Sequence, residues 1–404
     1  MQDLIFVSME NWDQVWRRNQ FLCAGLAQRY PEHKILFVGT PRDFSNQVRR
    51  GQLNLHDRTS HQLADFPNIT VTRPLKLLPN TVAAGRRINA AMERSHIRRE
   101  AKRLGMRSPI LWLNPHYAVH MVGQLQESAV VYDITDDWTT LTQSESLTRR
   151  IIAQDIELCS RADAVIVCSQ HLFDLKRERT DNLHLIPNGV DANHYTRVLD
   201  SADPLPASAA AWTKPVLGYT GTVHPDRVDV ALIEALARGL PEGSIALVGP
   251  NMLPASDEAR LRRCGNVVLT GAVPYSEIPV YMRAFDVCIT PHRVTPFTES
   301  LNPIKLWEYL AAGKPIVSTD VAGFRDYPQF VRIARNAKEF LEAIRGAVCE
   351  DSKICAARRT EARKHSWDLR LDHIVKVMND CVNARAPKTV SSKNRASVRS
   401  SRSL

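Results

Sequence analysis

The chain has 404 residues, of which 44% are hydrophobic and 24% are charged. This composition is typical of a globular protein with a sizeable core, and the length favours two domains. The net charge is +10, and the eight cysteines are scattered without a CxxC spacing. We therefore expect reduced, buried thiols, and neither a disulfide framework nor a zinc site.

The N-terminal segment MQDLIFVSMENWDQ has no basic stretch, and its apolar run has the length of a strand. It predicts neither a signal peptide nor a transmembrane helix, so we expect a cytoplasmic protein. The loop after this strand carries Trp12, Trp16, Arg17 and Arg18 and leads into an amphipathic helix. Aromatic and guanidinium groups suit a sugar or a lipid phosphate, so the four are candidates for the acceptor side, although core packing explains at least one tryptophan equally well.

Short β-branched apolar runs alternate with helix-length amphipathic stretches, which is typical of parallel sheets covered by helices. Two such sheets fit the pattern. Strands of the first half are expected at residues 4–8, 34–39, 69–74, 110–115, 130–134, 164–169 and 183–189. Strands of the second half are expected at residues 215–221, 244–249, 266–271, 286–291, 314–318 and 331–335.

Residues 200–213 are rich in proline, alanine and serine and predict a linker between the two sheets. The predicted domains are therefore 1–199 and 214–365, with a last helix at 366–385. The tail at 386–404 holds five basic residues and no acid among many serines, so we expect it to be disordered.

A second basic cluster lies on a predicted helix of the first half. It contains only two acidic residues, Glu93 and Glu100. Its basic residues are Arg86, Arg87, Arg94, Arg98, Arg99, Lys102, Arg103 and Arg107. Two interpretations fit: a solvated helix face, or attraction to an anionic membrane surface, where each basic residue contributes about 1 kcal/mol. The second suits an enzyme with a lipid-linked acceptor. No aromatic-plus-basic strand motif or zinc finger accompanies the charge, so we expect no nucleic-acid partner.

Parallel sheets bind ligands beyond the carboxyl ends of their strands. In the first half, Asp136 and Asp137 follow the strand at 130–134, and each is a candidate for the base that deprotonates an acceptor. Like charges this close raise one pKa, whereas helix capping is the alternative for either aspartate. His116, after the strand at 110–115, is an individually weaker candidate for the acceptor side.

In the second half, Gly221 and Thr222 end the strand at 215–221 in a tight turn where the backbone could approach an anion. His224 and Arg227 could add positive charge beside it. The sequence contains neither a G-x-x-x-x-G-K-[ST] phosphate loop nor a G-x-G-x-x-G fingerprint. This argues against an NTPase and against a simple dinucleotide dehydrogenase.

The most informative segment is SLNPIKLWEYLAAGKPIVST, residues 300–319. It predicts a helix of about ten residues, with Asn302 as the N-cap, Pro303 at the first position and Gly313 as the left-handed residue that ends it. Lys305 in the first turn is unfavourable unless an anion lies in front of it, and Glu308 follows on the same face. Lysine suits a diphosphate and a carboxylate suits ribose hydroxyls. Together they predict a sugar-nucleotide site.

The run EYLAAGKPIV, preceded by NPIK, resembles the donor-site helix of glycosyltransferases of the two-domain GT-B fold. The resemblance is to the family 4-like group that includes teichuronic acid and other bacterial exopolysaccharide transferases. Further segments in the same order extend it over nearly the whole chain: YDITDDW, LIPNGVD, LGYTGTV, ALVGP, VVLTGAVPYSEIPVYMRAFDVCITPHR and HSWDLR. It implies an α/β fold of two Rossmann-like domains facing across a cleft, with a last helix that crosses back to the first domain.

The resemblance also implies transfer of a sugar from a nucleoside diphosphate donor to a glycan or lipid-linked acceptor, in cell-surface polysaccharide synthesis at the cytoplasmic membrane face. Glu308 resembles the second of the family's two glutamates, which contacts the ribose. Ser300 stands where the first is expected, with Glu299 beside it, so the stereochemical outcome stays open. The nucleotide base would dock near Val273 and Tyr275. The remaining donor candidates are Leu301 and Asn302.

The acids of YDITDDW do not have the D-x-D spacing of metal-dependent transferases. We therefore expect a metal-independent enzyme without a cofactor, in which Lys305, helix N–H groups and the Gly221 backbone neutralise the diphosphate. Two alternatives remain: a sugar-nucleotide epimerase of the same architecture, and a non-catalytic basic binding protein on the same scaffold. In each case we expect a monomer or a weak oligomer.

Overall fold

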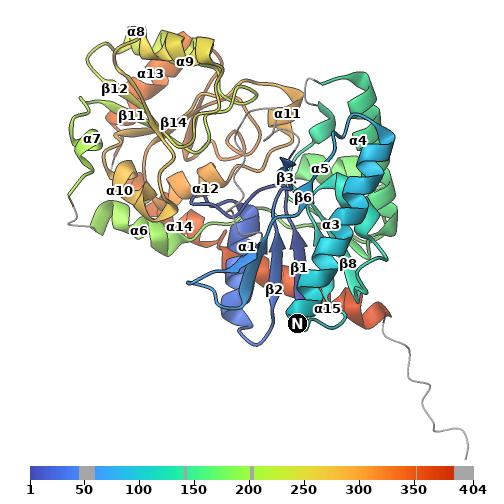
Figure 1. The fold of residues 1–404 in the computed structure, drawn as a ribbon. Coiled ribbons are helices and arrows are strands. Elements are labelled where there is room, and N and C mark those ends of the chain that lie inside the picture. Colours follow the sequence, from blue (N-terminus) through green and yellow to red (C-terminus); the bar gives the residue numbers. More distant parts are fainter. Residues whose placement is uncertain (45–59, 141–142, 201–203, 352, 386–404) are drawn as a thin grey trace, which may run out of the picture.

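The structure is a computed structural model that describes residues 1–44, 60–140, 143–200, 204–351 and 353–385. Each half of the chain forms a parallel sheet with a hydrophobic core on both of its faces, and the two halves stand side by side (Figure 1). The predicted tail at 386–404 lies outside the described residues. Every predicted strand is present.

The first sheet has the strand order β10-β9-β8-β7-β1-β2-β5-β4, in which only β4 runs antiparallel to its neighbour. Its central strands are continuous apolar runs because both faces are covered. The strands are β1 (Leu4–Val7), β2 (Ile35–Val38), β4 (Ser60–Gln62), β5 (Ile69–Thr72), β7 (Ile110–Leu113), β8 (Ala129–Ile134), β9 (Ala164–Val167) and β10 (Leu183–Leu185).

Helices on this sheet are α1 (Arg18–Arg29), α3 (Ala83–Arg103), α4 (Glu145–Arg161) and α5 (Gln170–Lys176), with short 3-10 turns η1 (His116–Met121) and η2 (Trp138–Thr140). A separate ribbon pairs β3 (Arg42–Asp43) with β6 (Leu75–Lys76). The sequence did not predict β3, β4 or β6, since two or three residues carry too short a pattern.

The second sheet has the order β13-β12-β11-β14-β15-β16, all parallel. Its strands are β11 (Val216–Thr220), β12 (Ser244–Val248), β13 (Val267–Gly271), β14 (Val287–Thr290), β15 (Ile316–Thr319) and β16 (Val331–Ala334). The helices around it are α6 (Ala192–Asp200), α7 (Ala207–Ala210), α8 (Val230–Gly239), α9 (Ala255–Arg262), α10 (Ile278–Arg283), α11 (Pro296–Glu299), α12 (Ile304–Ala311), α13 (Ala337–Val348) and α14 (Lys353–Arg363), with the 3-10 turn η3 (Tyr275–Glu277).

The boundary between the domains falls earlier than predicted. Val190, Tyr195 and Val198 are buried in the core of the second domain, although they precede residue 199. The predicted linker also contains secondary structure, because α7 lies within it and buries Ala209 in the same core. The proline, alanine and serine content predicted only a linker there, and did not predict this short helix with its buried alanine.

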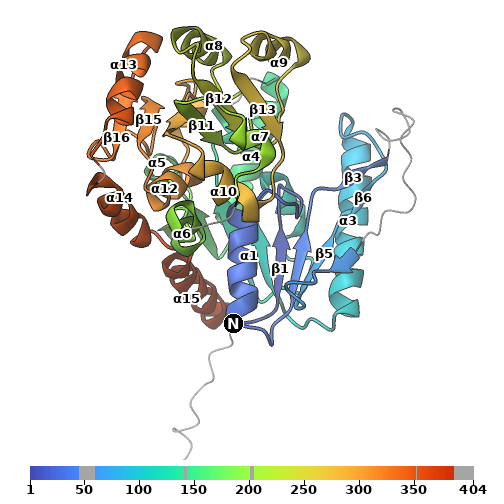
Figure 2. The same ribbon diagram turned by 90° about the vertical axis from the view of Figure 1, so that its left-hand side faces the viewer.

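The last helix, α15 (Trp367–Arg385), returns to the first domain and packs against α1 and β8 (Figure 2). It buries Trp367, Leu371, Ile374 and Met378 in the first domain's core. Gly25 on α1 makes this approach close, because a Cβ there would collide with the Leu371 side chain. Within the described ranges, none of the helices combines the length and apolar character needed to cross a bilayer.

Candidate active site

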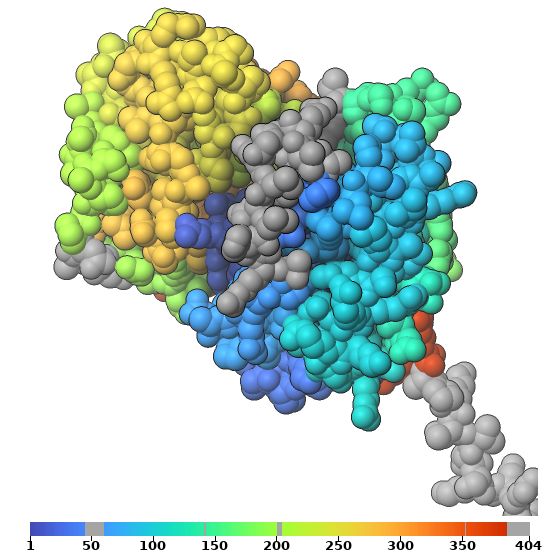
Figure 3. All heavy atoms as spheres, in the orientation of Figure 1, coloured from blue at the N-terminus to red at the C-terminus, as the bar shows by residue number. Residues whose placement is uncertain are grey.

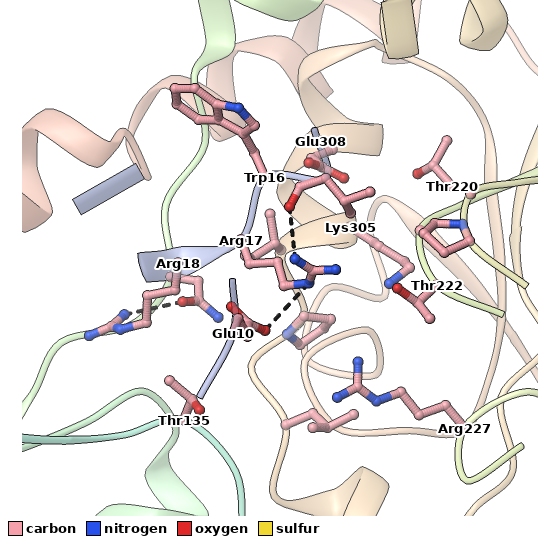
Figure 4. Close-up of a pocket in the computed structure, with 18 of the residues that line it drawn as sticks. Glu10, Trp16, Arg17, Arg18, Thr135, Thr220, Thr222, Arg227, Lys305 and Glu308 are labelled. Carbon is pink, nitrogen blue, oxygen red and sulfur yellow. Dashed lines mark hydrogen bonds and ion pairs between the residues drawn. The ribbon is translucent and has the colours of Figure 1, made fainter. Parts of the chain in front are cut away.

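A pocket of about 310 Å³ opens between the two domains (Figure 4). Residues that follow β1, β7 and β8 form its first wall, and residues that follow β11, β13 and β14 form the second together with the start of α12. This is the carboxyl edge of both sheets, where parallel sheets place their ligand sites.

Lys305 projects into this pocket from the first turn of α12. Its Nζ lies 5.2 Å from the centroid of the Tyr219 ring. The pKa of Lys305 is lowered to about 8, chiefly by burial and in part by the nearby Arg227 charge, whereas Glu308 partly opposes both effects. A lysine held near like charges in an enclosed space has the positive charge that an anionic ligand would offset.

Gly221 leaves room for this lysine. Its φ is +111°, and a Cβ at this position would lie 2.8 Å from Lys305 Nζ. The Gly221 N–H, however, donates to the Val248 carbonyl at 2.8 Å. This N–H is therefore not free for a phosphate, although Gly221 itself lines the pocket as expected.

Glu308 lines the same pocket one turn after Lys305. Burial raises its pKa, whereas the Tyr195 hydroxyl and the Lys305 charge lower it. The helix that carries both residues is shorter than expected and begins at Ile304. Asn302 is not its N-cap, because its side-chain oxygen accepts from the Asn188 N–H at 2.9 Å and so ties the two domains together. Gly313 has the expected left-handed conformation, with φ +71°.

The other donor candidates divide into two groups. Thr222, Arg227, Val273, Leu301 and Asn302 line the pocket with Lys305. His224 does not, because its ring turns to Asp226 at 3.5 Å.

The two residues at the expected first-acid position are also outside the pocket. Glu299 forms two hydrogen bonds with Arg325, at 2.7 and 2.8 Å. Ser300 is fully buried, accepts from the Asp137 N–H at 3.2 Å and donates to the Phe297 carbonyl. Both side chains form hydrogen bonds with other residues of the protein, so neither is placed to touch a donor.

Tyr275 lines the pocket at its second wall, and its ring lies between two others. The ring centroids are 5.3 Å from Trp16 and 4.0 Å from His194, and both pairs are nearly parallel. Its N–H donates to the Gln14 carbonyl of the first domain at 3.0 Å. Trp16 and Tyr275 thus join the two walls at this end.

The two candidate bases have different environments. Asp136 lines the pocket, accepts from the Thr135 hydroxyl at 3.0 Å and lies 3.8 Å from the Arg227 guanidinium across the cleft. Asp137 is buried and accepts from the Thr139 N–H at 3.1 Å, so it caps the η2 turn. The capping alternative therefore describes Asp137, and its assignment as a base is wrong.

The acceptor candidates are also separated. Trp16 and Arg17 line the pocket. Trp12 instead packs in an aromatic group, 5.2 Å from the Phe37 ring and 6.2 Å from the Trp16 ring.

Arg18 borders the pocket, but its guanidinium is committed to the buried Asp133 by two bonds of 2.9 and 3.0 Å. The charge is thus neutralised inside the fold, and the predicted acceptor contact is wrong. His116 lies away from the pocket, near Asp155, and burial lowers its pKa to about 4.

Sequence reasoning missed several pocket residues that follow strands, among them three with polar or charged side chains. Glu10 comes shortly after β1, His292 shortly after β14, and Asn188 in the loop after β10. Their position at strand ends was the available signal. In the described part of the chain, no three His, Cys, Asp or Glu side chains converge as a metal-binding set.

Comparisons with known proteins agree with this architecture. Residues 214–349 match the family model of glycosyl transferases group 1. A curated relative, TuaH of Bacillus subtilis (strain 168), is named as a teichuronic acid biosynthesis glycosyltransferase and is 28% identical over 203 residues. The match covers 48% of this chain and 50% of TuaH, so it spans about half the length of the relative.

Solved structures match over almost the full length. Sucrose-phosphate synthase from Thermosynechococcus elongatus has a TM-score of 0.72 at 15% identity, covering 95% of this chain and all of that one. HepE of Anabaena, solved in complex with UDP and glucose, has a TM-score of 0.64 at 16% identity, covering 94% of this chain and all of that one. At these identities the likeness concerns the fold. The α/β fold of GT-B type is thereby confirmed, and the match to the group 1 family model falls within its second domain.

Proposed function

We propose that this protein is a glycosyltransferase that moves a sugar from a nucleoside diphosphate donor to a glycan or lipid-linked acceptor in cell-surface polysaccharide synthesis. One observation carries the proposal: Lys305 and Glu308 share a pocket between two Rossmann-like sheets, one turn apart on α12. The group 1 match over residues 214–349 supports it, and so do the name of TuaH and the UDP bound to HepE.

The charges in the pocket fit the leaving group of such a reaction. A diphosphate gains negative charge as its bond to the sugar breaks, and cations already in place stabilise that change. Lys305 and Arg227 both line the second wall, where they would supply such cations, and the proposal needs neither a metal nor a cofactor. In this proposal Glu308 accepts hydrogen bonds from the ribose hydroxyls, and the nucleotide base binds near Val273 and Tyr275; all three residues line the pocket.

A transfer assay tests this proposal. The full-length protein is incubated with labelled nucleoside diphosphate sugars, with and without polysaccharide fragments or extracted membrane lipids. We expect label to move to an acceptor. A donor epimerised in the absence of acceptor would favour the epimerase, and binding of acceptor without turnover of any donor would favour the non-catalytic alternative.

We further propose that the acceptor is reached at the cytoplasmic membrane face, with the enzyme bound peripherally as a monomer or weak oligomer. The exposed side chains of α3, which lies at the surface in the view of Figure 3, support this. Both of its acids are turned inward: Glu93 and Glu100 are each 8% exposed, next to His120 and Arg103. The exposed face therefore carries only positive charge, with Arg87, Arg98, Arg99, Lys102 and Arg103.

Apolar side chains are exposed beside the start of this helix. They are Leu77, Leu78, Val82 and Ile88, with 37 to 58% of their surface accessible. Because α3 leads into the parallel strand β7, its N-terminus lies at the carboxyl edge of the sheet, as the pocket does. A basic face with an apolar tip is the combination that binds anionic bilayers.

Vesicle sedimentation tests the membrane part. Wild-type protein is expected to bind vesicles of phosphatidylcholine mixed with phosphatidylglycerol, and not vesicles of phosphatidylcholine alone. Replacing Arg98, Arg99 and Lys102 with glutamine removes about 1 kcal/mol each, so binding should fall roughly 150-fold. The same three-charge removal at the two ends of α14, at Lys353, Arg363 and the following Lys364, is the matched control. Equal losses in both triple variants would contradict a specific role for α3.

A further inference from the structure

Lys305 reaches from one face of the second sheet to the other. Its helix, α12, packs through Leu306 and Leu310 into the core on one face, whereas Tyr219 belongs to the core on the opposite face. Gly221 lies between them at the end of β11, and a Cβ there would lie only 2.7 Å from Lys305 Cε. The lysine therefore passes over the strand end, and its Nζ lies 5.2 Å from the centroid of the Tyr219 ring.

The Lys305 ammonium is held without a carboxylate. Among the described residues it forms neither an ion pair nor a hydrogen bond, and Glu308 acts on it only through space. The contact with the Tyr219 ring is the attraction that remains, because the face of an aromatic ring attracts a cation within about 6 Å, most strongly where water is excluded. All three N–H groups of the ammonium are thus left for a ligand.

The Tyr219 ring is itself fixed at its edge. The side chain is fully buried, and its hydroxyl donates to the Thr222 carbonyl at 3.1 Å. The same oxygen lies 3.4 Å from His292 Nε2 and, since its own proton is used, accepts from that nitrogen. Burial and the charges of Lys305 and Arg227 lower the pKa of His292 well below its usual value, so the imidazole is neutral. The plane of the Tyr219 ring is therefore set before any ligand binds.

We propose that Tyr219 is a positioning residue of the donor site, whose ring face holds the Lys305 ammonium beside the turn at Gly221 and Thr222. Figure 4 shows the lysine side chain running towards Thr222. Tyr219 does not itself line the pocket. A carboxylate in its place would neutralise the lysine and compete with a diphosphate, whereas the ring leaves the charge available. This inference rests on the function proposed above.

Nucleotide binding to full-length Tyr219→Leu and Tyr219→Phe tests the proposal. The probe is whichever of ADP, GDP and UDP binds wild type most tightly in calorimetry. Leucine removes the aromatic face, so the affinity at pH 7 should fall about 5- to 30-fold. Phenylalanine keeps the face and loses only the hydroxyl, so its affinity should stay within about threefold of wild type.

The pH dependence of binding separates positioning from packing. The ring stabilises the protonated form of Lys305, so its removal lowers the pKa of this lysine below the wild-type value of about 8. In Tyr219→Leu the midpoint of the decline in affinity with rising pH should therefore move down by roughly 0.5 to 1.5 pH units, whereas Tyr219→Phe should keep the wild-type midpoint. The charged and titratable neighbours of the lysine are the same in all three proteins: Arg227, Arg17, Glu308 and His292.

Tyr281→Leu is the matched control. Tyr281 is another buried tyrosine of the second domain, on α10, and it does not line the pocket. Its loss should lower the melting temperature and change neither the nucleotide affinity nor the pH midpoint. If Tyr219→Leu does not fold, Tyr219→Met replaces it, because methionine fills more of the volume without an aromatic face and should move the midpoint in the same direction.

Equal affinities and equal pH midpoints in the leucine and phenylalanine variants would overturn the proposal, because Tyr219 would then act only in the core. A shift of the midpoint in Tyr281→Leu as large as in Tyr219→Leu would overturn it as well. The proposed function would survive both results. It fails separately, if wild-type protein binds none of the three nucleotides and transfers no sugar.

Discussion

Lys305→Met is expected to weaken binding of the nucleoside diphosphate by roughly 10- to 150-fold. Hydrogen bonds to charged groups contribute about 1.5 to 3 kcal/mol each, and methionine keeps the length of the side chain while removing the ammonium group. The unliganded variant should melt no lower than wild type, because the lysine charge stands against Arg227 and Arg17. Calorimetry and thermal melting, with and without nucleotide, measure both effects.

The pH dependence of donor binding gives a second check on this lysine. Because the pKa of Lys305 is lowered to about 8 in the free protein, wild-type affinity should fall as the pH rises above 8, and the variant should lack this decline. Lys338→Met, on the exposed surface of α13, removes the same charge from the same domain and serves as the control. Unchanged nucleotide affinity in Lys305→Met would remove the central support for the donor site.

Arg18→Met is expected to destabilise the protein by about 3 to 5 kcal/mol, which is the usual cost of leaving a buried charge unpaired. Asp133 is fully buried and receives two bonds from this guanidinium, and Asn188 receives a third. The melting temperature should fall by roughly 6 to 20 °C.

A double variant separates this structural role from acceptor binding. In Arg18→Met with Asp133→Leu both charges are gone, and most of the lost stability should return. If Arg18→Met instead melted normally and raised only the KM for the acceptor, the residue would be an acceptor contact, as the sequence suggested.

The fold could be predicted because it depends on local patterns. Short apolar runs that alternate with amphipathic helices gave every predicted strand, and post-strand residues such as Asp136 and Gly221 do border the pocket. Lys305 and Glu308 were found together because three residues of helix fix their relation. The domain boundary was misplaced because Tyr195 packs in the core of the second domain. Local sequence patterns do not show which of two cores a side chain packs in.

The roles of single charged residues could not be read in the same way. Arg18 forms an ion pair with Asp133, and Glu299 forms one with Arg325. The partners are distant in the sequence, so no sequence spacing predicts either pair. Glu10 was missed for the same reason, since one carboxylate in a polar loop has no signature until the opposite wall is in place. Long-range pairing decides which charges remain available for chemistry.

Because α15 follows the second domain in the chain but packs on the first, the first domain is incomplete without the C-terminal end of the chain. A fragment that stopped at the end of the second sheet would leave the α1 side of the first sheet without Trp367, Leu371 and Ile374, and so with a bare apolar surface. Neither half should then be obtainable as an independent soluble fragment by cutting the chain at the linker. Insertion or gene-splitting experiments would have to keep residues 367–385 with the N-terminal half.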